Sequence, residues 1–247
     1  LSYNNFLDLA CARDVLGEFA GPHGTARGAG GNGREGDAAL AVVIKHGIPC
    51  GVAQAATLAE AYCRARDADA LSAFGGVVGL SRAVDAETAE RLNETFLEVV
   101  LAPDYQPDAL RLLEKKKSRV VARCPASSLR HPAAGLRGRF CGAGLLLQTA
   151  LPEGSGESDW RVVTRRAPTE TERADLLFGW KVLKHVRSNG VLFARDRRTV
   201  GVGSGQCSRI DSVEAAIRKA AREGIELRGA VMVSDAFFPF RDSVDRA

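Results

Sequence analysis

The chain has 247 residues, 45% of them hydrophobic and 26% charged, with a formal net charge of +4. This composition excludes a chain that is disordered throughout, because it supplies enough apolar surface for a core. No apolar run reaches the roughly 18 residues of a membrane helix, and the first residues lack the pattern of a signal peptide. We therefore expect a cytoplasmic protein that binds no membrane, and no nucleic acid either, since its basic residues are scattered among acids.

The first half of the chain alternates predicted helices and strands. Apolar periodicity predicts a helix over 4–20, and seven glycines without apolar period in 21–36 indicate a linker. The apolar run 38–44 predicts a strand buried on both faces, which ends abruptly at Lys45-His46. The later elements are a helix from Thr57 to about Arg66, a strand over 74–80, a helix over 86–96 capped by Asp85, a strand over 98–103, a helix over 109–117 capped by Asp108, and a strand over 119–122.

A second unit is predicted after a segment rich in Pro, Gly and Ser at 124–160. We place the units at 1–150 and 151–247, and expect both to be layered α/β structures. A capping box from Thr169 to Glu172 predicts the start of a helix over 170–187. The elements after it are strands over 190–195 and 199–203 joined by a hairpin turn, a helix over 212–223 capped by Asp211, a strand over 230–233, and the start of a further helix at the end of the sequence.

The pair Lys45-His46 is the sharpest chemical feature of the sequence. It follows a predicted buried strand directly, and α/β sheets bind ligands at the carboxyl ends of their strands. Histidine titrates near neutral pH and can act as a general base, while an adjacent ammonium can stabilise developing negative charge. The alternative is an ordinary solvated turn.

A zinc site is not expected. Pro49-Cys50 resembles part of the zinc-deaminase signature, but the second thiolate and the glutamate two residues after His46 are absent. The four histidines have no metal-ligand spacing, and no two of the six cysteines form a CxxC pair. We expect the cysteines to be reduced thiols that pack as small hydrophobic side chains.

Two segments of the second half suggest ligand binding. The glycine-rich loop 201–209 precedes a predicted helix and could hold an anion, although a tight turn is the alternative. Three phenylalanines cluster within 234–242 and could enclose a planar heterocycle, with Asp242 bonding to its ring nitrogens. The alternative is that these phenylalanines simply pack in the hydrophobic core. We expect His46 to face this phenylalanine cluster, in the same chain or in a second copy.

These segments together resemble one enzyme family, the aminoimidazole-carboxamide ribotide (AICAR) transformylase domain of bifunctional purine biosynthesis proteins. The resemblance covers nearly the whole chain and implies two tandem cytidine-deaminase-like three-layer α/β/α units without zinc. It is carried, in the same order, by IKHxxPCG at 44–51, SAFGG at 72–76, FLEVVLAP at 96–103, APTE…LLFxWKVxKHVxSN at 167–189, GxGxGQxSRxDSV at 201–213 and SDAFFPFxDS at 234–243.

The resemblance implies formyl transfer from 10-formyltetrahydrofolate to the 5-amino group of AICAR. His46 would be the general base, Lys45 would stabilise the oxyanion or protonate the leaving nitrogen, and Asn189 would position the formyl oxygen. The resemblance also implies an AICAR site at Phe74, Gly75 and Glu98, and a folate site at Arg209, Ile210, Pro239, Phe240 and Asp242.

The resemblance further implies a homodimer and, at Ser188 and Asp235, a potassium ion. It leads us to expect that segments holding the AICAR phosphate, and an IMP cyclohydrolase domain, lie outside these 247 residues. Three alternatives stay open: a fragment that binds ligand without turnover, a dimerisation module that binds neither ligand, and a zinc deaminase.

Overall fold

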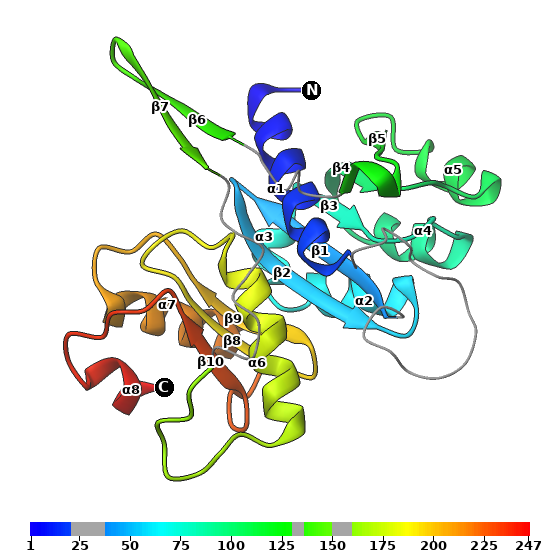
Figure 1. The fold of residues 1–247 in the computed structure, drawn as a ribbon. Helices are drawn as coiled ribbons and strands as arrows, with labels where there is room; N and C mark the ends of the chain where they lie inside the picture. Colours follow the sequence, from blue (N-terminus) through cyan, green and yellow to red (C-terminus); the bar gives the residue numbers. More distant parts are fainter. Residues whose placement is uncertain (21–37, 130–135, 150–159) are drawn as a thin grey trace.

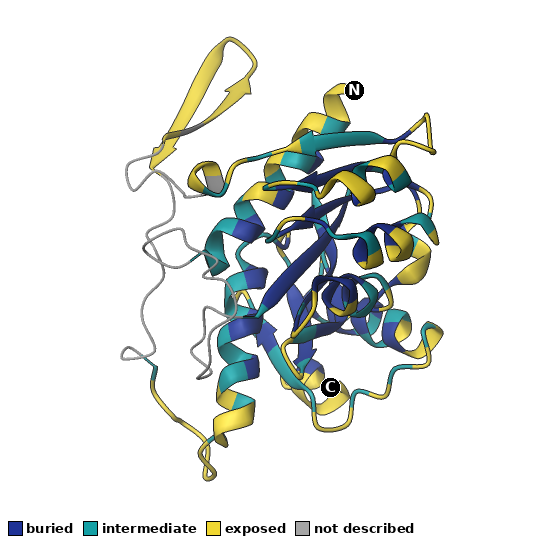
Figure 2. Ribbon diagram, turned by 90° about the vertical axis from the view of Figure 1, so that its right-hand side faces the viewer, coloured by how far each residue is buried: buried dark blue, intermediate teal, exposed yellow. Residues whose placement is uncertain are grey.

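The computed structural model describes residues 1–20, 38–129, 136–149 and 160–247, so the glycine-rich segment 21–36 lies outside the described residues. Its centre is an eight-stranded mixed sheet with the strand order β10-β8-β9-β2-β1-β3-β4-β5. Helices cover both faces of this sheet, and Figure 2 shows buried strands between helices whose outer sides are exposed. The predicted layered α/β fold is therefore confirmed.

The elements of the sheet and its helices agree with most of the predicted order (Figure 1). In chain order the structure has α1 (Tyr3–Phe19), β1 (Ala39–Lys45), β2 (Ile48–Ala55), α2 (Leu58–Arg66), α3 (Ala70–Ala73), β3 (Gly76–Leu80), α4 (Ala86–Asn93), β4 (Leu97–Ala102), α5 (Pro107–Leu113), β5 (Val120–Arg123), η1 (Ala126–Leu129), β6 (Leu136–Cys141), β7 (Gly144–Thr149), α6 (Glu170–Leu183), β8 (Val191–Arg195), β9 (Arg198–Gly203), α7 (Arg209–Arg222), β10 (Val231–Ser234) and α8 (Asp242–Arg246).

Strand β1 is buried on both faces, as predicted. Leu40, Val42 and Ile44 pack into the core beneath α1 and α6. The intervening residues of the strand pack into the core on the other face, beneath α2 and α4. Alternate side chains of a strand point to opposite faces, so a sheet covered by helices on both sides needs such a continuous apolar run.

Two predicted helix caps are wrong, and strand β2, into which the chain turns back directly after Lys45, was not predicted. Helix α5 begins after Gln106, with Pro107 in its first turn, so Asp108 is not its cap. Helix α7 is capped by Ser208, whose side chain accepts a hydrogen bond from the backbone N–H of Asp211. The segment 124–160 also contains a hairpin, β6–β7, that we did not predict.

The sheet contains the same arrangement twice. In the first unit β1 pairs antiparallel with both β2 and β3, and in the second unit β8 pairs antiparallel with both β9 and β10. Both hairpins carry a register shift two residue pairs before their turns. Each is flanked by a preceding helix, α1 or α6, and a following helix, α2 or α7. This duplication is the structural form of the two predicted tandem units, while the predicted boundary at 150 stays a prediction.

The two units join where β2 meets β9. Ala53 pairs with Arg198, and the Thr199 hydroxyl accepts a hydrogen bond of 3.0 Å from the backbone N–H of Val52. Because β2 and β9 lie side by side and antiparallel, the turn of each hairpin lies at the opposite end of the sheet from the other. No helix among the described residues is both long and apolar enough to cross a membrane.

Candidate active site

The Lys45-His46 pair lies at the turn of the β1–β2 hairpin. His46 and Gly47 form its two-residue turn, with φ values of 53° and 72°. Positive φ at both positions is what a tight hairpin turn of this hand requires; glycine adopts it without strain, and histidine is among the residues that tolerate it. The His46 side chain is exposed, so the turn presents the imidazole rather than burying it.

A buried carboxylate fixes this turn. Asp8 of α1 accepts hydrogen bonds from the backbone N–H groups of His46, at 3.3 Å, and Gly47, at 2.5 Å. Its side chain is 7% exposed. Since both oxygens bind turn amides, Asp8 holds the backbone of His46 at a defined distance from α1.

The turn opens onto a cleft of about 650 Å³ between α1 and the end of α6. All its lining residues belong to three segments: α1, the β1–β2 turn, and the chain around the end of α6. They are Asn4, Leu7, Asp8, Ala10, Cys11, Asp14, His46, Gly47, Lys184, His185, Val186 and Arg187. The imidazole of His46 therefore lines a cavity that segments from both units build.

Lys45 extends towards β3 and not into this cleft. Its Nζ donates a 2.7 Å hydrogen bond to the carbonyl oxygen of Gly75. Gly75 has a φ of 67°, and its own N–H donates to the carbonyl of Phe96 at 2.8 Å. The rings of Phe74 and Phe96 lie 5.2 Å apart, and both side chains are exposed. The structure thus brings Lys45 together with two of the three predicted AICAR residues.

The third predicted AICAR residue, Glu98, lies near the start of α1. Its Oε2 accepts a 2.6 Å hydrogen bond from the side chain of Asn5. Asn4, the neighbour of Asn5, lines the cleft. Helix α1 therefore connects Glu98 with the region of His46.

A group of three charged or polar side chains, Glu18, Lys184 and His185, lies beside the cleft at the end of α6. Lys184 Nζ lies 2.9 Å, and His185 Nε2 lies 3.4 Å, from the carboxylate of Glu18 on α1. Burial raises the pKa of Glu18, but the hydrogen bonds from His185 and Lys184 outweigh burial and lower this pKa from 4.5 to about 2. The group ties the two long helices together beside the cleft.

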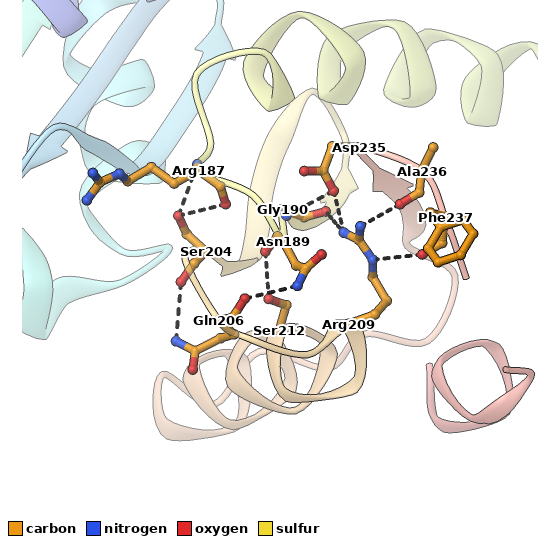
Figure 3. Close-up of polar contacts among 10 residues, drawn as sticks. All are labelled: Arg187, Asn189, Gly190, Ser204, Gln206, Arg209, Ser212, Asp235, Ala236 and Phe237. Carbon is orange, nitrogen blue, oxygen red and sulfur yellow. Dashed lines mark hydrogen bonds and ion pairs between the residues drawn. The ribbon is translucent and has the colours of Figure 1, made fainter. Parts of the chain in front are cut away.

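Asn189 lies in the connection between α6 and β8, shown in Figure 3. Its side-chain amide donates a 3.0 Å hydrogen bond to the carbonyl of Gln206, and its own carbonyl accepts one of 2.6 Å from the Ser212 hydroxyl. These bonds attach Asn189 to the loop before α7 and to α7 itself. The amide oxygen of Asn189 takes part in none of them.

Arg209 organises the predicted folate region from inside. It is buried, and its guanidinium donates to the carboxylate of Asp235 and to the carbonyls of Gly190, Ala236 and Phe237 (Figure 3). Burial raises the pKa of Asp235, while hydrogen bonds from Ser188 and Arg209 lower it by more. The arginine predicted to touch folate therefore also holds the chain after β10 in place.

The remaining predicted folate residues are accessible. Pro239, Phe240 and Asp242 are exposed, and Ile210 is half-buried at the start of α7. The Asp242 carboxylate accepts a 2.6 Å hydrogen bond from the N–H of Ser243. None of these residues lines the cleft beside His46 within the part of the chain that the structure describes. The structure thus has two clusters, linked through the segment 187–190.

The predicted cation site consists of oxygen donors. The Asp235 carboxylate accepts hydrogen bonds from Arg209 and from the N–H of Gly190 through Oδ1, and it also accepts one from the Ser188 side chain. Oxygen donors of this kind are the ligands that hard cations prefer, and the potassium ion at Ser188 and Asp235 stays a prediction. Across the ranges that the structure describes, no group of three His, Cys, Asp or Glu side chains could hold a metal.

Sequence reasoning missed Asp8, the residue that fixes the His46 turn. A carboxylate on the apolar face of a predicted helix is a signal, because acidic side chains are seldom buried without a partner. The position of Asp8 on this face could have shown that α1 supports a polar site, but it could not have shown which residues Asp8 contacts.

A family model described as "AICARFT/IMPCHase bienzyme" matches residues 1–219. Three similar proteins each carry the name "Bifunctional purine biosynthesis protein PurH". The one from Chlorobaculum parvum is 42% identical over 246 residues, covering 99% of this chain and 43% of the relative. The one from Myxococcus xanthus is 45% identical over 252 residues, covering 100% and 45%. The one from Aquifex aeolicus is 44% identical over 248 residues, covering 99% and 44%. The chain thus spans less than half the length of these relatives.

Proposed function

Because the chain belongs to the AICARFT/IMPCHase bienzyme family, we propose that it transfers a formyl group from 10-formyltetrahydrofolate to the 5-amino group of AICAR. The products are formyl-AICAR and tetrahydrofolate, and the process is purine biosynthesis. The observation that carries the proposal is the position of His46: a general base on a turn fixed by a buried carboxylate, at a cleft between two units.

The chemistry follows from these side chains. The 5-amino nitrogen attacks the formyl carbon, and His46 removes the proton that this nitrogen loses. The bond between the formyl carbon and N10 of the folate then breaks, and N10 takes a proton. Since the amine is a poor nucleophile, a positioned base is worth about 10²–10⁴-fold in rate.

Lys45 supplies the positive charge that the reaction needs next to the base. One of its three N–H groups binds the Gly75 carbonyl, which leaves two for the oxyanion of the intermediate or for N10. Asn189 would bind the formyl oxygen, and Phe74, Gly75 and Glu98 the AICAR ring and ribose. Arg209, Ile210, Pro239, Phe240 and Asp242 would form the folate site. A potassium ion held by Ser188 and Asp235 would supply only a fixed positive charge.

A homodimer belongs to the same proposal. Within the described residues, none of the predicted folate residues lines the cleft beside His46. A second copy that brings its folate cluster to the His46 cleft would complete the site. Light scattering of the purified chain tests this, with a molecular mass of about twice that of one chain as the expected result and a monomer as the contradicting one.

The test is formyl transfer by the purified chain and by two variants at equivalent turns. His46→Asn should lower the rate about 10²–10⁴-fold, whereas Asp196→Asn, at the turn of the β8–β9 hairpin, should leave it unchanged. Asparagine tolerates the positive φ of both positions, 53° in each, so neither variant strains its turn. Equal rates for wild type and His46→Asn would remove the imidazole from the mechanism.

The second activity in the family's name, IMP cyclohydrolase, is the competing assignment, and the same purified proteins test it. Conversion of formyl-AICAR to IMP, without tetrahydrofolate formation from AICAR, would assign the chain to that second reaction. AICAR or folate binding without turnover would leave a ligand-binding fragment, and no binding of either would leave a dimerisation module.

A further inference from the structure

An arginine that has no role in the assignments above, Arg187, lines the cleft together with His46. We infer that Arg187 binds an anionic group, either a phosphate monoester or a carboxylate, of the ligand that occupies this cleft. Three features support this role: the charges around the cleft, the attachment of the Arg187 backbone, and the position of Arg187 near both His46 and Asn189.

The other charged groups lining the cleft already have partners. Lys184 and His185 lie 2.9 Å and 3.4 Å from Glu18, and this carboxylate is largely buried. Asp8 accepts the two turn amides, and Asp14 lies 2.9 Å from Arg13. Within the described part of the chain, no carboxylate pairs with the guanidinium of Arg187. An incoming anion therefore finds one strong cation in the cleft that it does not have to take from an existing ion pair.

The backbone of Arg187 is held rigidly even though its side chain is exposed. Its N–H donates to the Ser204 hydroxyl at 3.1 Å, and its carbonyl accepts a bond of 3.0 Å from the N–H of Gly205. Figure 3 shows the side chain extending away from this loop, towards the strands of the first unit. A fixed Cα and an extended side chain reduce the entropy lost when the guanidinium binds a ligand.

The position of Arg187 suits a ligand that also reaches the reacting groups. It stands two residues before Asn189 and lines the same cleft as His46. A guanidinium binds phosphate and carboxylate through two parallel N–H bonds, which sets the orientation of the bound group as well as its affinity. Arg187 would thus orient one end of a ligand whose other end lies at His46.

The identity of the anion depends on the proposed function, but the anion site itself does not. If the chain acts on AICAR and 10-formyltetrahydrofolate, the two sources are the 5′-phosphate of AICAR and the glutamate carboxylates of the folate. Each source can be removed from its substrate without touching the reacting atoms, so kinetics can distinguish them.

The first experiment needs no turnover. Inorganic phosphate is titrated into wild type, Arg187→Gln, Arg187→Lys and Arg197→Gln, with binding followed by phosphorus NMR. Arg187→Gln should bind phosphate about 10–100-fold more weakly than wild type, and Arg187→Lys should lie between them. Arg197→Gln, an equally exposed arginine outside the cleft, should bind like wild type. Equal binding by wild type and Arg187→Gln, or no binding by wild type, would overturn the inference.

The second experiment assigns the source of the anion. KM is measured for AICAR and its nucleoside, and for the folate and an analogue that lacks glutamate. For wild type, KM should rise when the anion that Arg187 binds is removed from its substrate. For Arg187→Gln, KM for the intact substrate should already be raised and should rise no further when that anion is removed, while kcat stays nearly unchanged. If Arg187→Gln has the same KM as wild type for every substrate, this result would also contradict the role of Arg187. If the chain has no turnover, the proposed function fails while the phosphate titration still decides the inference.

Discussion

Glu18 is a carboxylate held by two side chains of the turn that follows α6, and its environment predicts how stability depends on pH. Its pKa is lowered from 4.5 to about 2, so it contributes stability above its ordinary pKa and loses this contribution as the pH falls through the lowered value. Glu18→Gln should therefore lower the free energy of unfolding at pH 7 by about 1–3 kcal/mol.

Urea unfolding of wild type and Glu18→Gln between pH 7 and pH 3 checks this prediction. The difference between them should be constant above about pH 5 and shrink below it. Glu114→Gln changes the same charge at an exposed position and should have no such effect. A difference that grows as the pH falls would show that Glu18 is not stabilised as a carboxylate.

At the scale of elements, both hairpins are attached to a helix in the same way. Asp8 of α1 accepts the turn amides of His46 and Gly47, and Asp175 of α6 accepts those of Asp196 and Arg197, at 3.0 Å and 2.7 Å. Asp8 and Asp175 are both 7% exposed. The second hairpin is thus a structural copy of the first without its imidazole.

Comparing the two hairpins distinguishes an effect on the position of His46 from an effect on the stability of the fold. Asp8→Asn should displace the His46 turn and lower the formyl-transfer rate on the order of 10²-fold. Asp175→Asn should destabilise the fold by a similar amount, because it breaks the same kind of bond, but should leave kcat nearly unchanged. Steady-state kinetics and urea unfolding of both variants give the result, and equal rates for the two variants would contradict the positioning role of Asp8.

The elements also show what the sequence could and could not predict. Strand β1 and the capping box of α6 follow from local patterns, and both are confirmed. Strand β2 was missed because Pro49 and Gly51 are typical of turns. In the structure, Pro49 pairs with Ile44 just after the register shift, a position where the missing N–H of proline is tolerated. For the site, the strand end at Lys45-His46 could be predicted, whereas the contact with Asp8, 38 residues away, depends on how α1 packs.

At the scale of the whole molecule, a group of ion pairs between Asp69 and helix α7 joins the two units. Asp69 is 3% exposed, and it lies 2.6 Å from Arg222 and 3.2 Å from Lys219 of α7. Asp69→Asn should cost about 2–4 kcal/mol, because it leaves two cations without their shared carboxylate. It should also weaken the coupling between the units.

Both tryptophans, Trp160 and Trp180, lie in the second half of the chain, so their fluorescence follows the unfolding of that unit and of the shared core against which Trp180 packs. In wild type, the unfolding transitions by fluorescence and by circular dichroism should coincide, and in Asp69→Asn they should separate. Asp67→Asn removes a carboxylate whose partner, Arg66, lies in the same unit, so its two transitions should stay together. Coincident transitions in Asp69→Asn would mean that the remaining contacts between the units, which include the core shared beneath α1 and α6, suffice to couple the halves.

The repeated hairpin has one more consequence. Asp196 already adopts the backbone conformation of His46, in a turn tied to its helix by an identical carboxylate. Asp196→His would place an imidazole on a turn that already has this conformation, at the opposite end of the sheet from Arg187 and Asn189. An inactive Asp196→His turn would show that catalysis depends on the surroundings of the imidazole, and an active one would show that the turn geometry shared by both hairpins is sufficient.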